Sequence, residues 1–165
     1  MATRSRRHLA ADAWGALLQV HAALVPELDR SMRSHSGLPL GWYDVLLELA
    51  TVQEGRLRMS ALAERAVLSR TRISRVVDEL VRAGLVSKEP NPEDARSSYA
   101  VITPEGRRRF ETSAPHYVTQ IEKRFAAGLT DDELRTIARA LRRVQTHVIG
   151  GTARMAEGDQ RHTHN

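Results

Sequence analysis

The feature that most restricts how this chain can fold is a pair of predicted helices joined by a tight turn, over residues 61–82. In the second helix, residues 70–82, apolar side chains recur at positions i, i+3, i+4, i+7 and i+8, the spacing of a helix with one buried face. Ser60 is a suitable N-cap for the first helix, residues 61–67, and Gly84 suits the C-terminal end of the second. The apolar residues of the second helix are Ile73, Val76, Val77, Leu80 and Val81.

A β-hairpin is predicted directly after this pair. Residues 85–89 and 98–102 are short strand-like runs, and the segment between them is rich in Pro, Asn and Asp, which favour turns. Residues 57–59 could add one very short strand before the helix pair. A helix-turn-helix followed by a hairpin predicts a winged helix-turn-helix.

Long amphipathic helices flank this centre on both sides. They are predicted over residues 9–34, 40–53, 104–126 and 131–149. Pro26 should kink or divide the first of them, because an interior proline costs ~3 kcal/mol. Thr103 and Pro104 form a strong helix start, a capping box over residues 130–133 opens the last helix, and Gly150 with Gly151 should end it. We therefore expect a mainly α fold with a small β-hairpin wing.

The positive charge of the chain is concentrated in its middle third. Residues 56–109 hold 12 Lys or Arg against 7 Asp or Glu, and the rest of the chain holds 13 of each, so the whole net charge of +5 lies in this segment. Such a distribution is expected of a protein that binds nucleic acid. It does not decide the question alone, because basic proteins are common and coding bias would also give 23 Arg against 2 Lys.

The outward face of the predicted 70–82 helix is the candidate DNA reader. With Ile73 at the centre of the buried face and 100° per residue, the polar residues near the N-terminus point away from the core or lie beside that direction. These residues are Thr71, Arg72, Ser74 and Arg75. Hydroxyl and guanidinium groups can reach phosphates and the guanine edge, and the helix N-terminus adds partial positive charge. The alternative is an ordinary solvated face, but such a face usually mixes charges within each turn, and here the first acid, Asp78, comes only after two turns.

The predicted hairpin offers a second candidate contact. Arg96, at its tip, could enter a minor groove, which is narrow and strongly negative in A·T-rich DNA, and Lys88 lies on the first strand. Asp94 is expected to hold the loop or to orient Arg96 through a charge-assisted hydrogen bond, although the segment could also simply make a turn. The candidate DNA-binding residues are Ser69, Arg70, Thr71, Arg72, Ser74, Arg75, Lys88, Arg96, Ser97 and Ser98, with Ser69 as helix cap and Asp94 as support.

The segment from Ser69 to Gly106 carries a specific set of motifs. Leu-Val-Arg-Ala-Gly-Leu-Val ends at residue 86, Pro-Glu-Asp-Ala-Arg at residue 96, and Val-Ile-Thr-Pro-Glu-Gly at residue 106. Together they resemble the signature region of MarR-type winged helix-turn-helix transcriptional regulators, and the helix order extends the resemblance over about residues 9–149. It implies a homodimer whose first and last helices interlock and which reads an inverted repeat in double-stranded DNA. The amphipathic helices at both ends support a dimer independently, because each needs a partner for its apolar stripe.

This organisation divides the chain into five parts. We expect a basic N-terminal tail, N-terminal helices for dimerisation, a DNA-binding winged helix-turn-helix, C-terminal dimerisation helices and a disordered tail. Their residue ranges are 1–8, 9–53, 54–103, 104–150 and 151–165.

The resemblance also implies a ligand. Members of that family often bind small aromatic or anionic molecules between the dimerisation helices and the winged domain, and binding weakens their affinity for DNA. Trp14, His21, Trp42 and Tyr43 lie on the helices that would line such a pocket, and His21 interrupts an apolar stripe. Packing in the core or in a dimer interface is the alternative role for these residues. The expected function is a homodimeric repressor that a ligand releases; the alternative is an architectural or protein-interaction module without effector control.

Other classes of protein lack support in the sequence. The absence of Cys excludes disulfides, zinc fingers and thiol chemistry. We find no Gly-rich phosphate loop, paired carboxylates or activated nucleophile, so we expect neither an enzyme nor a cofactor. We expect no metal site, because His162 and His164 lie in the expected tail and no spacing elsewhere suggests a set of metal ligands. No apolar run has the length of a signal peptide or of a membrane span of ~20 residues, so we expect a cytoplasmic protein.

Overall fold

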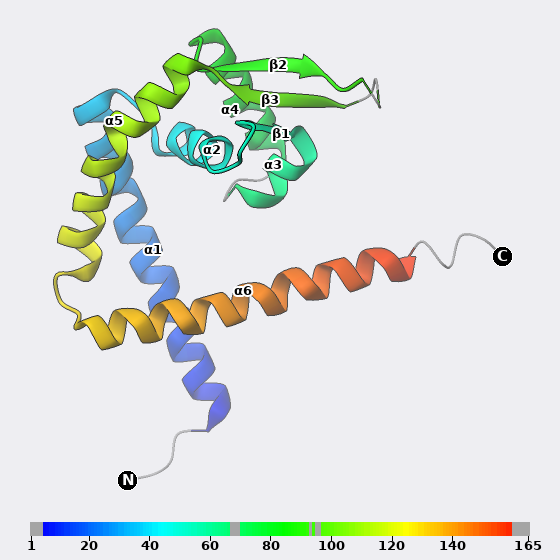
Figure 1. Cartoon of the computed structure of the whole chain (residues 1–165). Coiled ribbons are helices and arrows are strands. Elements are labelled where there is room, and N and C mark those ends of the chain that lie inside the picture. Colours follow the sequence, from blue (N-terminus) through cyan, green and yellow to red (C-terminus); the bar gives the residue numbers. More distant parts are fainter. Residues whose placement is uncertain (1–4, 67–69, 93, 95–96, 160–165) are drawn as a thin grey trace. The chain divides into compact units, whose positions relative to one another are not determined.

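The computed structural model of this protein describes residues 5–66, 70–92, 94 and 97–159; the side chains of residue 70 and of residues 149–159 lie outside this description. The described part is mainly helical and contains one small antiparallel sheet (Figure 1). The chain divides into two compact units, Met1–Arg124 and Phe125–Asn165. The predicted fold class, mainly α with a small β wing, is confirmed.

The elements follow the predicted order. They are α1 (Arg6–Ser36), α2 (Leu40–Ala50), β1 (Arg56–Arg58), α3 (Met59–Arg65), α4 (Arg70–Arg82), β2 (Val86–Pro90), β3 (Ser98–Ile102), α5 (Pro104–Ile121), the π-helical turn η1 (Glu122–Ala126) and α6 (Asp131–Asp159).

The sheet has the order β1-β3-β2, so β3 lies in the centre and pairs antiparallel with both neighbours. Ala100 of β3 is opposite Leu57 of β1 and Lys88 of β2. The Ile102 amide donates a 2.9 Å hydrogen bond to the Gly55 carbonyl, which extends the β1–β3 pairing by one bond. The helix-turn-helix of α3 and α4 therefore lies in the chain between two strands that both pair with β3.

Helices α2, α3 and α4 pack with the inner face of the sheet around one apolar core. The predicted buried face of α4 is confirmed at Ile73, Val76, Val77 and Leu80. Val81, by contrast, is 37% exposed, so its predicted core position is wrong. It lies at the edge of the apolar stripe, where the neighbouring elements no longer cover the helix.

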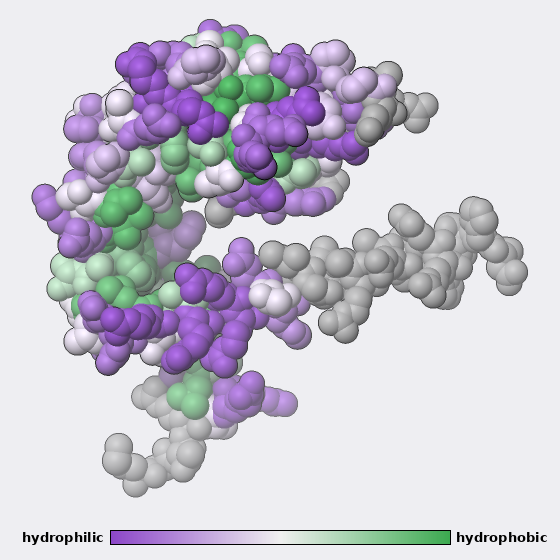
Figure 2. Space-filling model, viewed as in Figure 1, coloured by the Kyte–Doolittle hydropathy of each residue, from purple (hydrophilic) through white to green (hydrophobic). Residues whose placement is uncertain are grey.

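Helices α1 and α5 lie side by side (Figure 1). The rings of His35 and His116 stack at 3.8 Å with 5° between their planes, and the Ser31 hydroxyl lies 2.9 Å from Nε2 of His116. Leu28 and Met32 of α1 are buried, and Figure 2 shows apolar side chains emerging between hydrophilic ones along this pair of helices. The C-terminal half of α1 thus belongs to the core of the first unit.

The helix caps follow the sequence closely. Gly84 has a φ of +72°, which suits glycine after the end of α4, and Thr103 Oγ1 accepts a 3.0 Å hydrogen bond from the Gly106 amide at the start of α5. In the capping box before α6, the Thr130 amide donates to Glu133 at 2.8 Å. These three predicted caps are confirmed.

Four predicted boundaries require correction. The N-cap position of α3 is Arg58 and not Ser60, and α2 ends at Ala50 instead of residue 53. Pro26 lies inside α1, which is not divided. Helix α6 continues through Gly150 to Asp159, because glycine weakens a helix by about 1 kcal/mol without preventing helical geometry. Among the helices described, none is long and apolar enough to cross a membrane.

Candidate nucleic-acid interface

Helix α4 presents a polar, basic face beside its buried stripe. Ile73 is only 1% exposed, so the core fixes the rotation of the helix about its axis. The four predicted reader residues near its N-terminus are exposed, and none of them is acidic. They are Thr71, Arg72, Ser74 and Arg75. The geometry can present two hydroxyls and two guanidinium groups to a ligand, whereas Ser69 and the side chain of Arg70 lie outside the described residues.

Glu79 connects α4 to α2 and also lies beside Arg75. The indole Nε1 of Trp42 donates a 3.0 Å hydrogen bond to Oε2 of Glu79. The other oxygen, Oε1, lies 3.6 Å from Nε of Arg75, which is one helical turn earlier. The Arg75 side chain is 79% exposed and that of Glu79 is 32% exposed, so the arginine projects from a carboxylate that the protein partly covers.

Arg72 lies in the electrostatic field of two carboxylates. Burial raises the pKa of Asp44 to about 6, the charge of Glu48 adds to this rise, and the charge of Arg72 opposes it. Burial also raises the pKa of Asp29, but hydrogen bonds from Arg33 and the Leu40 amide, together with the charges of Arg33 and Arg72, outweigh that effect and leave the pKa below its usual value. The start of α4 thus couples electrostatically to α1 and α2.

In the wing, Lys88 pairs with α4. Its Nζ lies 2.6 Å from Oδ1 of Asp78, and this hydrogen bond lowers the pKa of that exposed carboxyl. The predicted DNA contact of Lys88 therefore competes with a bond that links β2 to α4.

The turn at the end of the wing is held by Asn91. This residue is 2% exposed, and its Nδ2 donates a 2.7 Å hydrogen bond to the Ser97 hydroxyl. The Ser97 amide also donates to the Asp94 carbonyl at 3.0 Å, and the Ser98 side chain is half-buried at the start of β3. Arg96 lies outside the described residues, so its minor-groove contact and its support by Asp94 stay predictions.

Sequence reasoning missed Glu79 and Asn91 as organisers of this surface. The sequence gives Glu79 no role of its own, because Asp78 is the first acid of the helix, and it indicates for Asn91 only a place in a turn. A spacing of four between Arg75 and Glu79 does predict a helical ion pair. Nothing in the sequence places the Trp42 indole on the same carboxylate, because the two residues are 37 positions apart.

Comparison with known proteins agrees with this geometry. Residues 36–97 match the family model described as MarR family. Over this segment the chain is similar to the MarR family.

Solved structures from Streptomyces coelicolor are similar to this chain. AbsC, a MarR family transcriptional regulator, has a TM-score of 0.76 at 27% identity and covers 91% of this chain and 99% of its own. Sco3205, solved in complex with DNA, has a TM-score of 0.77 at 28% identity and covers 88% of this chain and 91% of its own.

A curated relative is the transcriptional repressor YetL of Bacillus subtilis. It is 32% identical over 85 residues, which cover 52% of this chain and 51% of the relative. The second curated relative is matched over 60% of its length, so the chain spans between half and two thirds of the curated relatives it matches.

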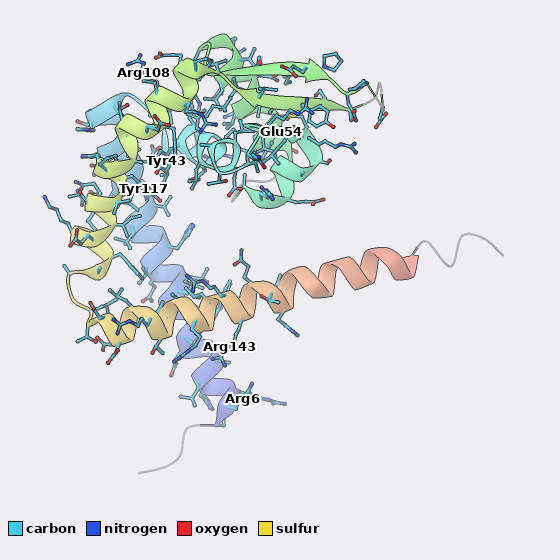
Figure 3. All side chains as sticks on the ribbon, in the orientation of Figure 1. Arg6, Tyr43, Glu54, Arg108, Tyr117 and Arg143 are labelled. Carbon is cyan, nitrogen blue, oxygen red and sulfur yellow. The ribbon has the colours of Figure 1, made fainter. Side chains whose placement is uncertain are left out.

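The four residues predicted for a ligand pocket lie in two different settings. Trp14 is 60% exposed on the N-terminal half of α1, where His21 is exposed as well. Tyr43 is buried, and its ring packs 4.7 Å from that of Tyr117, as Figure 3 shows between α2 and α5. Trp42 is half-buried and bonded to Glu79. The structure does not bring the four side chains together.

Burial also changes the acidity of the packed aromatic pair. It raises the pKa of Tyr43 and of Tyr117, and the charge of Asp44 adds to both shifts. A concave surface elsewhere is lined by residues of α6 alone, namely Arg139, Arg142, Arg143, Thr146 and His147, and includes none of the predicted pocket residues. Among the described residues, no group of three or more His, Asp and Glu side chains could hold a metal ion.

Proposed function

We propose that this protein is a sequence-specific DNA-binding transcriptional regulator that acts as a homodimer on an inverted repeat. The observation that carries the proposal is the outward face of α4, where Thr71, Arg72, Ser74 and Arg75 are exposed beside a buried stripe. Guanidinium groups on such a face suit both phosphates and the guanine edge in a major groove. The similarity to Sco3205, solved in complex with DNA, supports the same partner here.

The exposed apolar residues of the terminal helices support the dimer. On α1 the apolar stripe that is buried at Leu28 continues toward the N-terminus, where its members are exposed. These are Leu9, Trp14, Leu17 and Leu18. On α6 the exposed apolar residues are Leu141, Val144 and Val148. Figure 2 shows apolar atoms exposed on the N-terminal half of α1. Apolar faces of this kind are expected to be covered by a second copy, since homodimers are the commonest closed assemblies.

Repression and release by a small aromatic or anionic ligand complete the proposal. Repression is supported by the similarity to the repressor YetL. The ligand is implied by the resemblance to MarR-type regulators, and the aromatic residues of α1 and α2 remain its predicted site although the structure separates them. A thermal-shift screen against phenolic and anionic metabolites tests it: we expect one compound that raises the melting temperature and lowers DNA affinity. A screen without any such compound favours a regulator or architectural protein without effector control.

Binding to DNA is tested by enriching duplexes from a random-sequence pool and measuring their affinity by fluorescence anisotropy. We expect an enriched palindrome whose affinity exceeds that of a scrambled duplex by roughly 10³-fold or more. Arg72→Ala and Arg75→Ala should each lower this ratio. Arg108→Ala removes one charge from the exposed side of α5 and serves as the control, for which we expect an unchanged ratio. Equal affinity of the unsubstituted protein for enriched and scrambled duplexes would refute the proposal.

A further inference from the structure

A chain of three side chains joins α2 to the outward face of α4. Trp42 donates to one oxygen of Glu79, and the other oxygen faces Arg75. We propose that Trp42 and Glu79 are positioning residues that orient Arg75 toward a guanine, so that they determine the sequence discrimination of the protein. The inference rests on the DNA-binding function proposed above.

The strength of this arrangement comes from the anchored carboxylate. An exposed ion pair between residues i and i+4 of a helix is weak, because both side chains lose conformational freedom when they meet. Here the indole of Trp42 already holds Glu79 at 3.0 Å, and Trp42 is packed against the core of the first unit. Only Arg75 has to lose freedom when the pair forms, so its orientation is set before DNA arrives.

The atoms that meet in the pair leave the recognition edge of Arg75 available. Glu79 lies next to Nε, at 3.6 Å. A guanidinium that binds guanine bidentately donates two hydrogen bonds to O6 and N7. The two terminal nitrogens can supply both donors while Nε faces the carboxylate. Glu79 therefore favours an end-on approach of Arg75 to the base.

A negative charge next to a DNA-reading arginine also has a cost, since it repels nearby phosphates. That cost falls on every duplex, whereas the benefit of a fixed arginine falls only on duplexes with a guanine in the right place. The arrangement thus exchanges overall affinity for discrimination. This separates it from a purely structural link between α2 and α4, which would affect all duplexes alike.

The experiment measures the ratio of dissociation constants for two duplexes. One is enriched by the unsubstituted protein from a random pool, and the other has a G·C pair replaced at the position most sensitive to Arg75→Ala. Trp42→Phe removes the indole N–H and keeps an aromatic ring and the net charge. We expect it to lower the ratio about three- to tenfold while affinity for a scrambled duplex changes less than about twofold.

Glu79→Gln gives a second, independent variant. The amide oxygen can still accept from Trp42, but the attraction to Arg75 is lost. We expect tighter binding to scrambled duplex and a lower discrimination ratio. Glu111→Gln, at an exposed position of α5, makes the same charge change and should leave the ratio unchanged. If Trp42→Phe does not fold, Glu79→Gln decides the question.

A double-mutant cycle distinguishes positioning from stability. In the Arg75→Ala background, Trp42→Phe and Glu79→Gln should cause no further loss of discrimination, because the residue that they orient is gone. Losses that add to that of Arg75→Ala, or equal weakening on all duplexes with a lower melting temperature, overturn the inference. If a duplex is enriched but both variants discriminate as well as the unsubstituted protein, the inference is overturned and the proposed function stands. Failure to enrich any duplex overturns the proposed function as well.

Discussion

Gly106 stands where α5 approaches the end of α4 and the start of β2. A Cβ atom on this residue would lie 2.0 Å from the Leu85 carbonyl oxygen and 3.1 Å from Cγ1 of Ile102. That carbonyl accepts a hydrogen bond from the Thr103 amide, so it cannot move freely. We expect Gly106→Ala to lower the free energy of unfolding by about 2–3 kcal/mol, measured by urea denaturation.

The matched control is Gly128→Ala, where a Cβ atom would meet nothing within 4 Å. It should change the free energy of unfolding by no more than about 0.5 kcal/mol. A Gly106→Ala protein as stable as this control would show that α5 can shift away from Leu85 without cost.

Asp44 and Asp29 should respond to pH in opposite ways. Burial and Glu48 raise the pKa of Asp44 to about 6, so the protein loses stability as the pH rises from the unfolded pKa of 3.8 to that value. The pKa of Asp29 lies below its usual value, because its hydrogen bonds outweigh burial. Its charged form therefore contributes stability above the unfolded pKa of 3.8, and this is lost as the pH falls through the folded value.

The corresponding variants follow from these signs. At about pH 7.5, Asp44→Asn should raise the free energy of unfolding by on the order of 1–3 kcal/mol, and Asp29→Asn should lower it. The Asp44→Asn difference should shrink toward about pH 4.5, whereas the Asp29→Asn difference should persist there and shrink only as the pH falls below 3.8. Urea denaturation across this range measures them, and a stability gain of Asp44→Asn that does not depend on pH would contradict the assignment.

Some residue roles could be predicted from the sequence, and others depend on contacts across the fold. The exposed face of α4 follows from helical periodicity, which needs only local spacing. The need for glycine at residue 106 arises from Leu85, and the role of Trp42 arises from Glu79. Such pairings depend on tertiary structure, so local spacing predicts neither of them.

Among the elements, α4 was predicted best and α6 worst. The bounds of α4 follow from a strict apolar stripe and from Gly84, whose φ of +72° does end the helix. The same reasoning failed at Gly150, where a glycine pair continues as helix. The difference is that glycine permits a helix end without imposing one. For β1 the sequence predicts only a very short strand and no partner. Its pairing with β3 connects residues more than 40 positions apart, which local patterns do not indicate.

The start of α5 provides a prediction at the same scale. Thr103 Oγ1 accepts from the Gly106 amide and donates to the Gly84 carbonyl at 2.8 Å, so one hydroxyl joins the end of α4 to the start of α5. We expect Thr103→Val to lower the free energy of unfolding by about 1–2 kcal/mol. Thr103→Ser keeps the hydroxyl and should retain most of the stability; an equal loss in both variants would assign the effect to the methyl group instead.

For the whole molecule, the exposed apolar stripe of α1 predicts an assembly. We expect the protein to sediment as a dimer in analytical ultracentrifugation. Leu17 is 40% exposed, and Leu17→Glu should shift the dimer toward monomer because it places a charge in the apolar contact. Glu111→Lys changes charge on the exposed side of α5 and should leave the dimer intact. A monomeric unsubstituted protein would contradict the proposed assembly.

The central position of β3 has a mechanical consequence. Residues 98–102 are bonded on one side to the wing strand β2 and on the other to β1, which leads without a break into α3. A force that tilts the wing is therefore carried through β3 and β1 to the first helix of the helix-turn-helix. The hairpin is thus fixed at its base. If contact with a DNA backbone bends it, the packing of α4 in the helix-turn-helix would be strained at the same time.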